Sequence, residues 1–191
     1  MIKNRIQVEC EWLLFLSATE EISEVRKLKE SKQARIRKIY LDLTVGDAEK
    51  VKEIEKTTNH DVKAVEYFIK KEFDKLDLGK YKEFIHFGLT SQDINNTAIP
   101  LSVKKGVEKV YIPMLEKILD RLKNLVKEYK EIPILSRTHG QPASPTKLGK
   151  EIKVFITRIN EQLKLLRNIP IAAKFGGATG NFNAHHIAYK N

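Results

Sequence analysis

The chain has 191 residues, of which 41% are hydrophobic, enough for one domain or for a small domain and part of a larger one. Its 35 basic and 25 acidic residues give a formal charge of +10, so its field attracts anions. The single cysteine, Cys10, excludes an internal disulfide and fits a reducing cytosol. No signal peptide or membrane-spanning run is evident. We therefore expect a cytoplasmic protein with no membrane partner.

In the first half of the chain, apolar residues recur every three or four positions, which predicts a series of amphipathic helices. We expect them at residues 2–19, 24–43 and 48–56 and from residue 62 onward, with a break at Gly46. Asn59 or Asp61 is expected to cap the last of these helices. The N-terminus of that helix also attracts anions, and His60 lies beside it as a donor or proton carrier. Capping alone and anion binding both remain open for this segment.

The second half contains two long apolar stripes, at residues 103–129 and 148–166. Thr90 and Asp93 precede the first stripe and resemble a capping box. Pro100 and Pro113 predict kinks near and within it. Two such stripes joined by a short link predict an antiparallel helical bundle. The predicted fold class is therefore all-α, with an N-terminal helical domain at residues 1–87 and part of a central helical bundle at residues 88–191.

The link between the stripes, Ile134–Ala143, contains an arginine, hydroxyls, an imidazole and a carboxamide. Pro133, Gly140 and Pro142 punctuate it, so the backbone must leave the helix here. Polar chemistry is commonly placed on such links between rigid helices. A functional segment and a plain connector with a hydrogen-bonded His139 are both consistent with these residues.

The histidines all lie in non-helical punctuation of the predicted pattern: His60, His86, His139, His185 and His186. No two of them have the i, i+4 spacing of a helical zinc site, and the only cysteine is remote in sequence, so we expect no metal. The remaining set combines histidine with Thr, Ser, Asp, Asn and Gln. These side chains suit the binding of a polar anion and proton transfer near neutral pH.

Four segments of the chain resemble adenylosuccinate lyases, a family of the fumarase/aspartase superfamily, and they occur in the same order as in that family: Thr57–Glu66, His86–Asn96, Ser136–Ala143 and Gly177–Asn183. One segment alone would be only suggestive, but four in order over nearly the whole chain are specific. The Thr-Ser and Thr-His pairs are shared with argininosuccinate lyase and fumarase. The Thr-Asn-His-Asp-Val run favours the adenylosuccinate branch.

The resemblance implies a lyase that cleaves a C–N bond by β-elimination and releases fumarate. Its substrates would be adenylosuccinate, giving AMP, and the succinyl-carboxamide ribotide of purine synthesis, with no cofactor. A substrate that carries a phosphate and two carboxylates suits a basic protein. The resemblance also implies the long-helix bundle of the fumarase/aspartase type, and a homotetramer in which each active site takes residues from three subunits.

The resemblance further assigns roles to residues of the second half. His139 would be the general acid that protonates the leaving amine, and Thr138 would help to hold the succinyl part. Thr90 and Ser91, at the start of the long helix, would bind a substrate carboxylate through hydroxyl and amide donors.

Residues of the first half would lie at the nucleotide side of the substrate. Asn59, His60 and Asp61 would line it, and His86 would lie close by in phosphate binding or a hydrogen-bond relay. The sequence does not rank His60 against His86.

Two departures from the family pattern concern the ends of the chain. The serine-bearing loop that supplies the family's catalytic base is not found, and neither is the N-terminal Arg-Tyr segment that contacts phosphate. We therefore expect a fragment without the extreme N-terminus and the C-terminal half, inactive or nearly so alone.

Two alternatives remain open. One is another lyase of the superfamily. The other is a non-catalytic helical fragment that oligomerises or binds a polyanion such as nucleic acid, with a steep dependence on salt. Because most aromatic residues lie on apolar stripes, a platform for stacking bases is not evident, and we expect no nucleic-acid partner.

Overall fold

The computed structural model describes residues 1–25 and 27–189, so residue 26 of the helix predicted at 24–43 and the last two residues lie outside it. The chain divides into two compact units, a first unit of Met1–Ser102 with Ala172–Asn191 and a second unit of Val103–Ile171. Helices dominate both units, which confirms the predicted helical fold class. No described helix combines the length and the apolar character that crossing a membrane requires. The predicted boundary after residue 87 stays a prediction.

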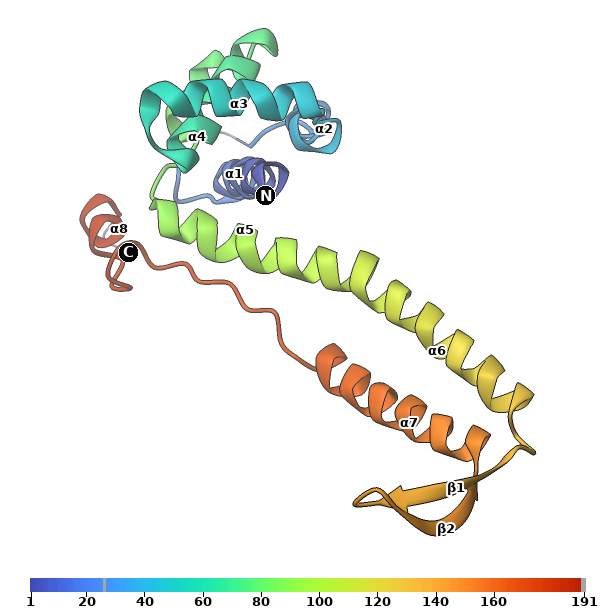
Figure 1. The fold of residues 1–191 in the computed structure, drawn as a ribbon. Coiled ribbons are helices and arrows are strands. Elements are labelled where there is room, and N and C mark those ends of the chain that lie inside the picture. Colours follow the sequence, from blue (N-terminus) through green and yellow to red (C-terminus); the bar gives the residue numbers. More distant parts are fainter. Residues whose placement is uncertain (26, 190–191) are drawn as a thin grey trace. The chain divides into compact units, whose positions relative to one another are not determined.

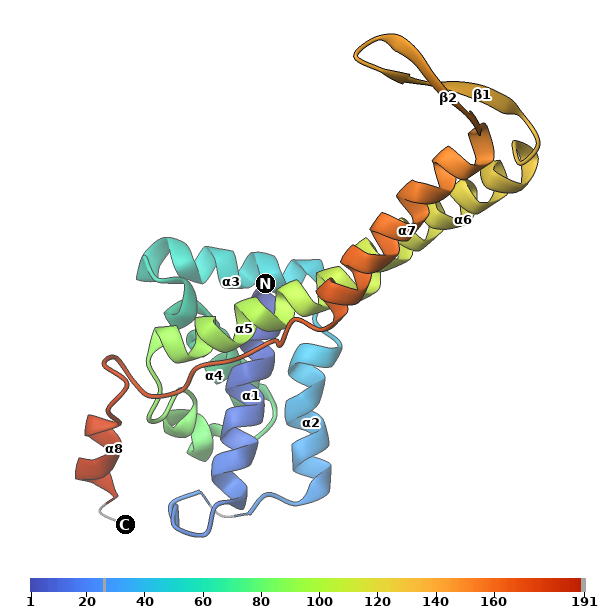
Figure 2. The same ribbon diagram turned by 90° about the horizontal axis from the view of Figure 1, so that it is seen from below.

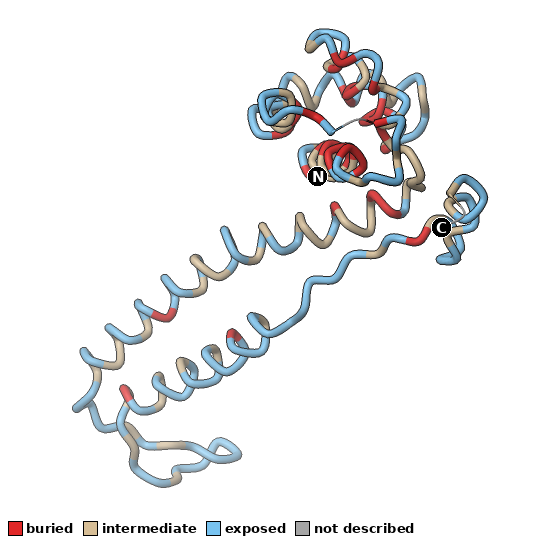
Figure 3. Tube along the Cα trace, turned by 180° about the vertical axis from the view of Figure 1, so that it is seen from behind, coloured by how far each residue is buried: buried red, intermediate tan, exposed pale blue. Residues whose placement is uncertain are grey.

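The helices of the first unit pack around one hydrophobic core, which appears as the concentration of buried residues in Figure 3. Its elements are α1 (Ile2–Ala18), α2 (Glu30–Leu41), α3 (Val45–Thr58), α4 (Asp61–Lys75), the 3-10 helix η1 (Gly79–Phe84), most of α5 (Ser91–Gly106) and α8 (Asn183–Ala188). Figure 1 shows α3 and α4 next to each other above α1. Ile69 and Phe73 of α4 are fully buried in this core. The core therefore fixes α1 and α4, which carry the buried residues Glu9 and Glu66 described below.

Two boundaries differ from the prediction for physical reasons. The second helix begins at Glu30 rather than Glu24, because Val25 and Leu28 are buried from a non-helical segment and only imitate the helical spacing. Gly46 does not break the chain but lies in the first turn of α3. The reciprocal hydrogen bonds of a capping box between Thr44 and Asp47 start that helix around it.

The second unit is a helical hairpin, α6 (Ile112–Glu128) and α7 (Leu148–Arg167), which lie side by side in Figures 1 and 2. Gly149 allows the close approach, since a Cβ there would meet the carbonyl oxygen of Val126 at 2.8 Å. A π-helical segment, η2 (Val107–Tyr111), precedes Pro113 of α6, where the prediction placed a kink. Both helices leave large apolar side chains exposed, among them Met114, Ile118, Phe155 and Leu165.

The link between α6 and α7 is a two-stranded antiparallel sheet, β1 (Pro133–Thr138) and β2 (Gln141–Lys147), which the sequence did not predict. His139 and Gly140 form the turn with φ values of 51° and 77°. Positive φ at both central residues is the type I′ geometry that matches the twist of a hairpin. Prolines suggested an irregular loop, but both strands of a two-stranded ribbon have a free edge, where proline costs no ladder hydrogen bond.

Candidate functional site

His60 is the N-cap residue of α4, a role that the sequence analysis gave to Asn59 or Asp61. Its Nδ1 accepts the backbone N–H of Lys63 at 3.2 Å. Asn59 is instead the left-handed C-cap of α3, with φ of 49°, so Asn59 and His60 are the two residues between the helices. The imidazole acceptor thus replaces the usual carboxylate or amide oxygen at this helix start. Because Nδ1 accepts the hydrogen bond from Lys63, the neutral ring of His60 carries its proton on Nε2.

Ser91 lies at the start of α5, and its Oγ is 3.2 Å from Nε2 of His60. With the proton of His60 on Nε2, the ring donates to Oγ and leaves the hydroxyl proton of Ser91 free to donate elsewhere. The N–H groups in the first turn of a helix attract anions, although in α5 those of Asp93 and Ile94 already donate to the carbonyl of Thr90. The side chains of His60 and Ser91 are both partly exposed, so a ligand can reach them. This contact joins two of the four motif segments.

Asp61 connects the polar corner formed by His60 and Ser91 to α1. Its Oδ2 forms an ion pair with Nη2 of Arg5, and Nε of Arg5 donates to Oδ1 of Asn95 at 2.9 Å. Asp61 is on α4, Arg5 on α1 and Asn95 on α5, so one guanidinium ties together the helices that carry His60 and Ser91. The sequence analysis missed Arg5, which lies in the middle of a charge-rich helix and carries no local signal.

Thr90 precedes Ser91, and its two donors are both used within the protein. Its backbone N–H and its Oγ1 each donate to Oδ2 of Asp93 at 2.8 Å, the carboxylate half of the capping box that the sequence predicts. Of the two residues expected to bind a carboxylate, Ser91 is therefore the one whose hydroxyl proton is available. Thr90 instead caps the N-terminus of α5 through its hydrogen bonds to Asp93.

Asp93 also brings the glycine-rich segment to the start of α5. Its Oδ1 accepts the backbone N–H groups of Gly176 at 3.0 Å and Gly177 at 3.2 Å. Lys174 lies 3.4 Å from the same oxygen and donates to the carbonyl of Gly177 at 2.5 Å. Burial raises the pKa of Asp93, but the hydrogen bonds from Thr90 and Gly176 and that from Lys174 outweigh it, so the pKa is below its usual range. One buried carboxylate thus joins the second and fourth motif segments.

Replacing Asp93 by alanine is expected to lower the free energy of unfolding by about 1–3 kcal/mol near neutral pH, because buried N–H groups lose their acceptor. Since the pKa of Asp93 is lowered by folding, its contribution is present above the unfolded value of about 3.9 and is lost as pH falls through the folded value. Urea unfolding at several pH values should show a difference from wild type that is constant above about pH 5 and shrinks in acid.

The control for this prediction is Glu53→Ala. Glu53 forms an exposed ion pair with Lys56 on α3, and exposed pairs contribute about 0–1 kcal/mol. An Asp93→Ala protein as stable as wild type, or a difference that grows in acid, would contradict the role given to Asp93.

His86 follows η1 in a left-handed conformation, with φ of 64°. Its Nδ1 is 2.7 Å from Oε1 of Glu9 on α1, and its side chain is 18% exposed whereas that of Glu9 is fully buried. Burial lowers the pKa of His86, but the hydrogen bond and the charge of Glu9 outweigh it, so that the pKa is raised. The pKa of Glu9 is also raised, in its case by burial. The pair therefore retains its proton to higher pH than isolated groups would.

Thr138 and His139 belong to the second unit. Thr138 ends β1 and pairs with Gln141 of β2, and His139 is the exposed first residue of the turn. Arg137 beside them reaches the carbonyl of Gly140 with Nη1, at 3.4 Å. The hairpin thus presents an imidazole at its tip on a backbone that is hydrogen-bonded on both sides.

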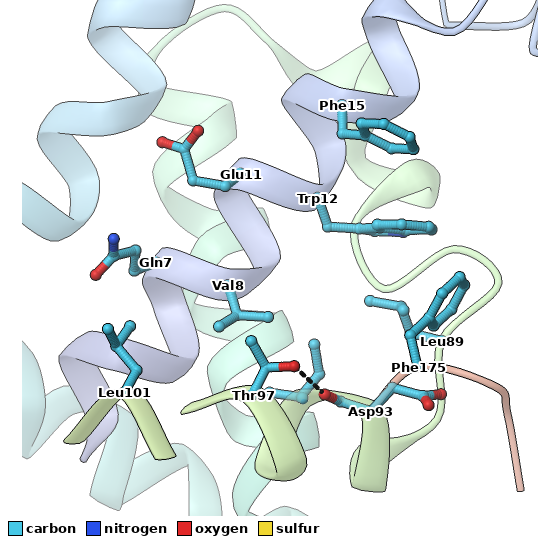
Figure 4. Close-up of a pocket in the computed structure, with 11 residues that line it drawn as sticks. Gln7, Val8, Glu11, Trp12, Phe15, Leu89, Asp93, Thr97, Leu101 and Phe175 are labelled. Atoms are coloured by element: carbon cyan, nitrogen blue, oxygen red, sulfur yellow. Dashed lines mark hydrogen bonds between the residues drawn. The ribbon is translucent and has the colours of Figure 1, made fainter. Parts of the chain in front are cut away.

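An apolar groove of about 370 Å³ lies in the first unit between α1 and the start of α5, shown in Figure 4. Its walls include Trp12, Phe15 and Phe175, and Thr97 donates to the backbone carbonyl of Asp93 beneath them. None of the predicted site residues lines it. The groove is therefore a separate feature from the polar corner at His60 and Ser91. Among the described residues, no group of three His, Cys, Asp or Glu side chains is arranged to hold a metal ion.

Known proteins resemble this chain in sequence and in fold. A protein-family model described as lyase matches residues 2–191. The chain is 53% identical to an adenylosuccinate lyase of Dictyostelium discoideum over 194 aligned residues, and 45% identical to one of Haemophilus influenzae over 192. These alignments cover 99% and 100% of this chain but 42% of each relative, so the chain spans about two fifths of the length of the curated relatives.

Solved structures resemble the fold at lower identity. A fumarate lyase from Mesorhizobium superposes with a TM-score of 0.75 at 20% identity, over 99% of this chain and 42% of that one. A 3-carboxy-cis,cis-muconate lactonizing enzyme from Pseudomonas putida superposes with a TM-score of 0.71, also at 20% identity, with the same coverage. At this identity the likeness concerns the fold.

Proposed function

The chain belongs to the lyase family, and from this premise we propose that it supplies the substrate-binding and acid side of an active site that cleaves a C–N bond by β-elimination and releases fumarate. The proposed substrates are adenylosuccinate, giving AMP, and the succinyl-carboxamide ribotide of purine synthesis. The names and identities of the relatives support this choice over other lyases. The observation that carries it is the contact of His60 with Ser91, which joins two motif segments at the start of a helix.

The proposed chemistry needs no cofactor, since it is not a redox reaction: the electron pairs of the C–H and C–N bonds shift within the substrate, and two protons are transferred. A base takes the proton from Cβ, the Cα–Cβ double bond forms, and the C–N bond breaks with its electrons going to nitrogen. We assign to His139 the proton that this nitrogen receives. The base belongs, in this proposal, to a part of the complete protein outside these 191 residues.

The substrate carries a phosphate and two carboxylates, and the first unit offers donors suited to them. Ser91, with the N–H groups at the start of α5, would bind one carboxylate, and Thr90 would hold that turn in place through Asp93. His60 would orient the Ser91 hydroxyl, with Asn59 and Asp61 beside it at the nucleotide side. Thr138 would contact the succinyl part from the hairpin. The charge of +10 would favour the approach of a polyanion.

We further propose a homotetramer in the cytoplasm for the complete protein. The apolar side chains that α6 and α7 leave exposed, such as Met114 and Phe155, support association through these helices. The charge alone would also suit nucleic acid, but it is spread over all helices and mixed with acidic residues, which favours a solvated surface.

The proposal is tested in a chimera in which these 191 residues replace the matching segment of the Dictyostelium relative. Ser91→Ala is expected to raise KM for adenylosuccinate about tenfold or more, because a hydrogen bond to a charged group contributes about 1.5–3 kcal/mol. Fumarate release measured by absorbance gives kcat and KM.

Ser102→Ala is the matched control for that substitution. Ser102 lies on the same helix, where its hydroxyl donates to the carbonyl of Ala98, away from His60. Unchanged KM in Ser91→Ala, or an equal rise in both variants, would contradict the proposed role. Binding that weakens steeply with salt and equally in every variant would instead favour non-specific attraction of polyanions.

A further inference from the structure

Glu9 is a charged residue at a core position of α1. It is fully buried, and its Oε2 has no hydrogen-bond partner among the described residues. Its other oxygen, Oε1, is 2.7 Å from Nδ1 of His86. A buried carboxylate is costly unless it is paired, so a side chain of this kind in a core is commonly there for a specific partner. The partner here is a single ring nitrogen.

The segment around His86 is held by α1 at a second point. Nε1 of Trp12 donates to the carbonyl oxygen of Phe87 at 2.7 Å. Glu9 and Trp12 are three residues apart and so share one face of the helix. Consecutive residues, His86 by its side chain and Phe87 by its backbone, are thus bound to consecutive turns of α1. These two contacts stabilise the backbone at His86, which has a positive φ, a conformation that is uncommon for histidine.

We propose that Glu9 is a positioning residue that keeps a proton on Nδ1 of His86 and leaves Nε2 as the nitrogen that faces the substrate. The inference rests on the proposed function in one respect only, the presence of a substrate at His86. In the neutral ring the carboxylate accepts Nδ1–H, and in the charged ring it pairs with the imidazolium. Nδ1 therefore carries the proton in both states, and Nε2 alone changes.

His60 and His86 then differ in which ring nitrogen carries the proton. His60 accepts the N–H of Lys63 on Nδ1, so its neutral ring keeps the proton on Nε2 and donates towards Ser91. His86 donates through Nδ1 to Glu9, so its neutral ring offers an acceptor at Nε2. His60 is suited to orienting a hydroxyl, whereas His86 is suited to accepting a proton or, when charged, to pairing with a phosphate. The proposal therefore gives the two histidines separate roles, which the sequence does not distinguish.

The charges that act on His86 come from α1 and α4. Burial lowers its pKa, Glu9 raises it through the hydrogen bond and its charge, Glu66 raises it, and Lys63 lowers it. Glu66 is itself paired with Lys63 at 2.6 Å and with Lys70 at 3.1 Å, so much of its effect is neutralised. Glu9 is therefore the group whose removal is expected to change the titration of His86 most.

The test uses the 191-residue chain with ¹⁵N-labelled histidine and needs no activity. Long-range ¹H–¹⁵N spectra above the pKa of each ring should show His86 with its proton on Nδ1 and His60 with its proton on Nε2. Glu9→Gln should lower the pKa of His86 by about one unit or more, since the carboxylate charge is lost while a hydrogen-bonding side chain remains.

Glu11→Gln is the matched control. It removes one charge from the same helix, but Glu11 pairs with Arg37 and Tyr40 rather than with His86. A neutral His86 with its proton on Nε2 would overturn the proposal, as would an equal change of its pKa in both variants. The wild-type spectrum shows which nitrogen of His86 carries the proton even if Glu9→Gln fails to fold. Because both readouts are independent of turnover, failure here is distinct from failure of the proposed lyase activity.

Discussion

Replacing His139 by asparagine in the chimera is expected to reduce kcat for fumarate release by about 10²- to 10⁴-fold, the range over which general acid–base catalysis contributes. The breaking C–N bond leaves an amine that needs a proton, and His139 presents the imidazole to which we assign that step. Asparagine is the informative substitution because His139 has a φ of 51° at the hairpin turn. Asparagine adopts this conformation readily, so the turn is retained while the acid is removed.

His186→Asn is the control for that prediction. His186 is exposed on α8 and lies outside the four motif segments. The steady-state assay should show a large loss in the first variant and wild-type kcat in the second. A His139→Asn chimera that keeps more than about half of its kcat would exclude His139 as the acid.

Replacing Phe73 by alanine is expected to lower the free energy of unfolding by about 3–5 kcal/mol. Phe73 is the largest fully buried side chain of the first unit and packs in the core that holds α1 and α4 together. The loss comes from the apolar surface no longer buried and from the cavity left behind. Since domains are stabilised by only about 5–15 kcal/mol, the midpoint of urea unfolding should fall markedly.

Tyr67→Ala on the same helix is the comparison. Tyr67 is 42% exposed and makes a cation–π contact with Lys63, so its loss should cost about 1 kcal/mol or less. If both substitutions lowered the free energy of unfolding by the same amount, Phe73 would not be part of the hydrophobic core. Far-UV circular dichroism during unfolding gives both values.

The helices were predictable because their apolar spacing has a single physical cause, burial of one face. The ends of α1 and α7 agree with the prediction within one residue. The stripe predicted at 103–129 ends within one residue of α6, but it begins nine residues before that helix because it also includes the end of α5 and η2. The hairpin at His139 was not predictable in the same way. Its prolines indicated a loop, and the type I′ turn places a histidine, rather than the usual Asn or Gly, in a left-handed conformation.

The residues of the candidate site were identified by motif, but their contacts were not. No periodicity predicts that His60 contacts Ser91 or that Asp93 binds the backbone of Gly176 and Gly177, since these contacts join residues 31 to 84 positions apart. Glu9 did leave a signal that was missed. It lies three residues after Ile6 and four before Leu13, within the apolar stripe of α1, where a carboxylate is out of place.

The most direct test of the lyase assignment is the release of fumarate from adenylosuccinate by the wild-type chimera, with argininosuccinate as the competing substrate. The account predicts turnover of adenylosuccinate with AMP and fumarate formed in equal amounts, and no turnover of argininosuccinate. A folded chimera that releases no fumarate from adenylosuccinate, or that prefers argininosuccinate, would contradict it.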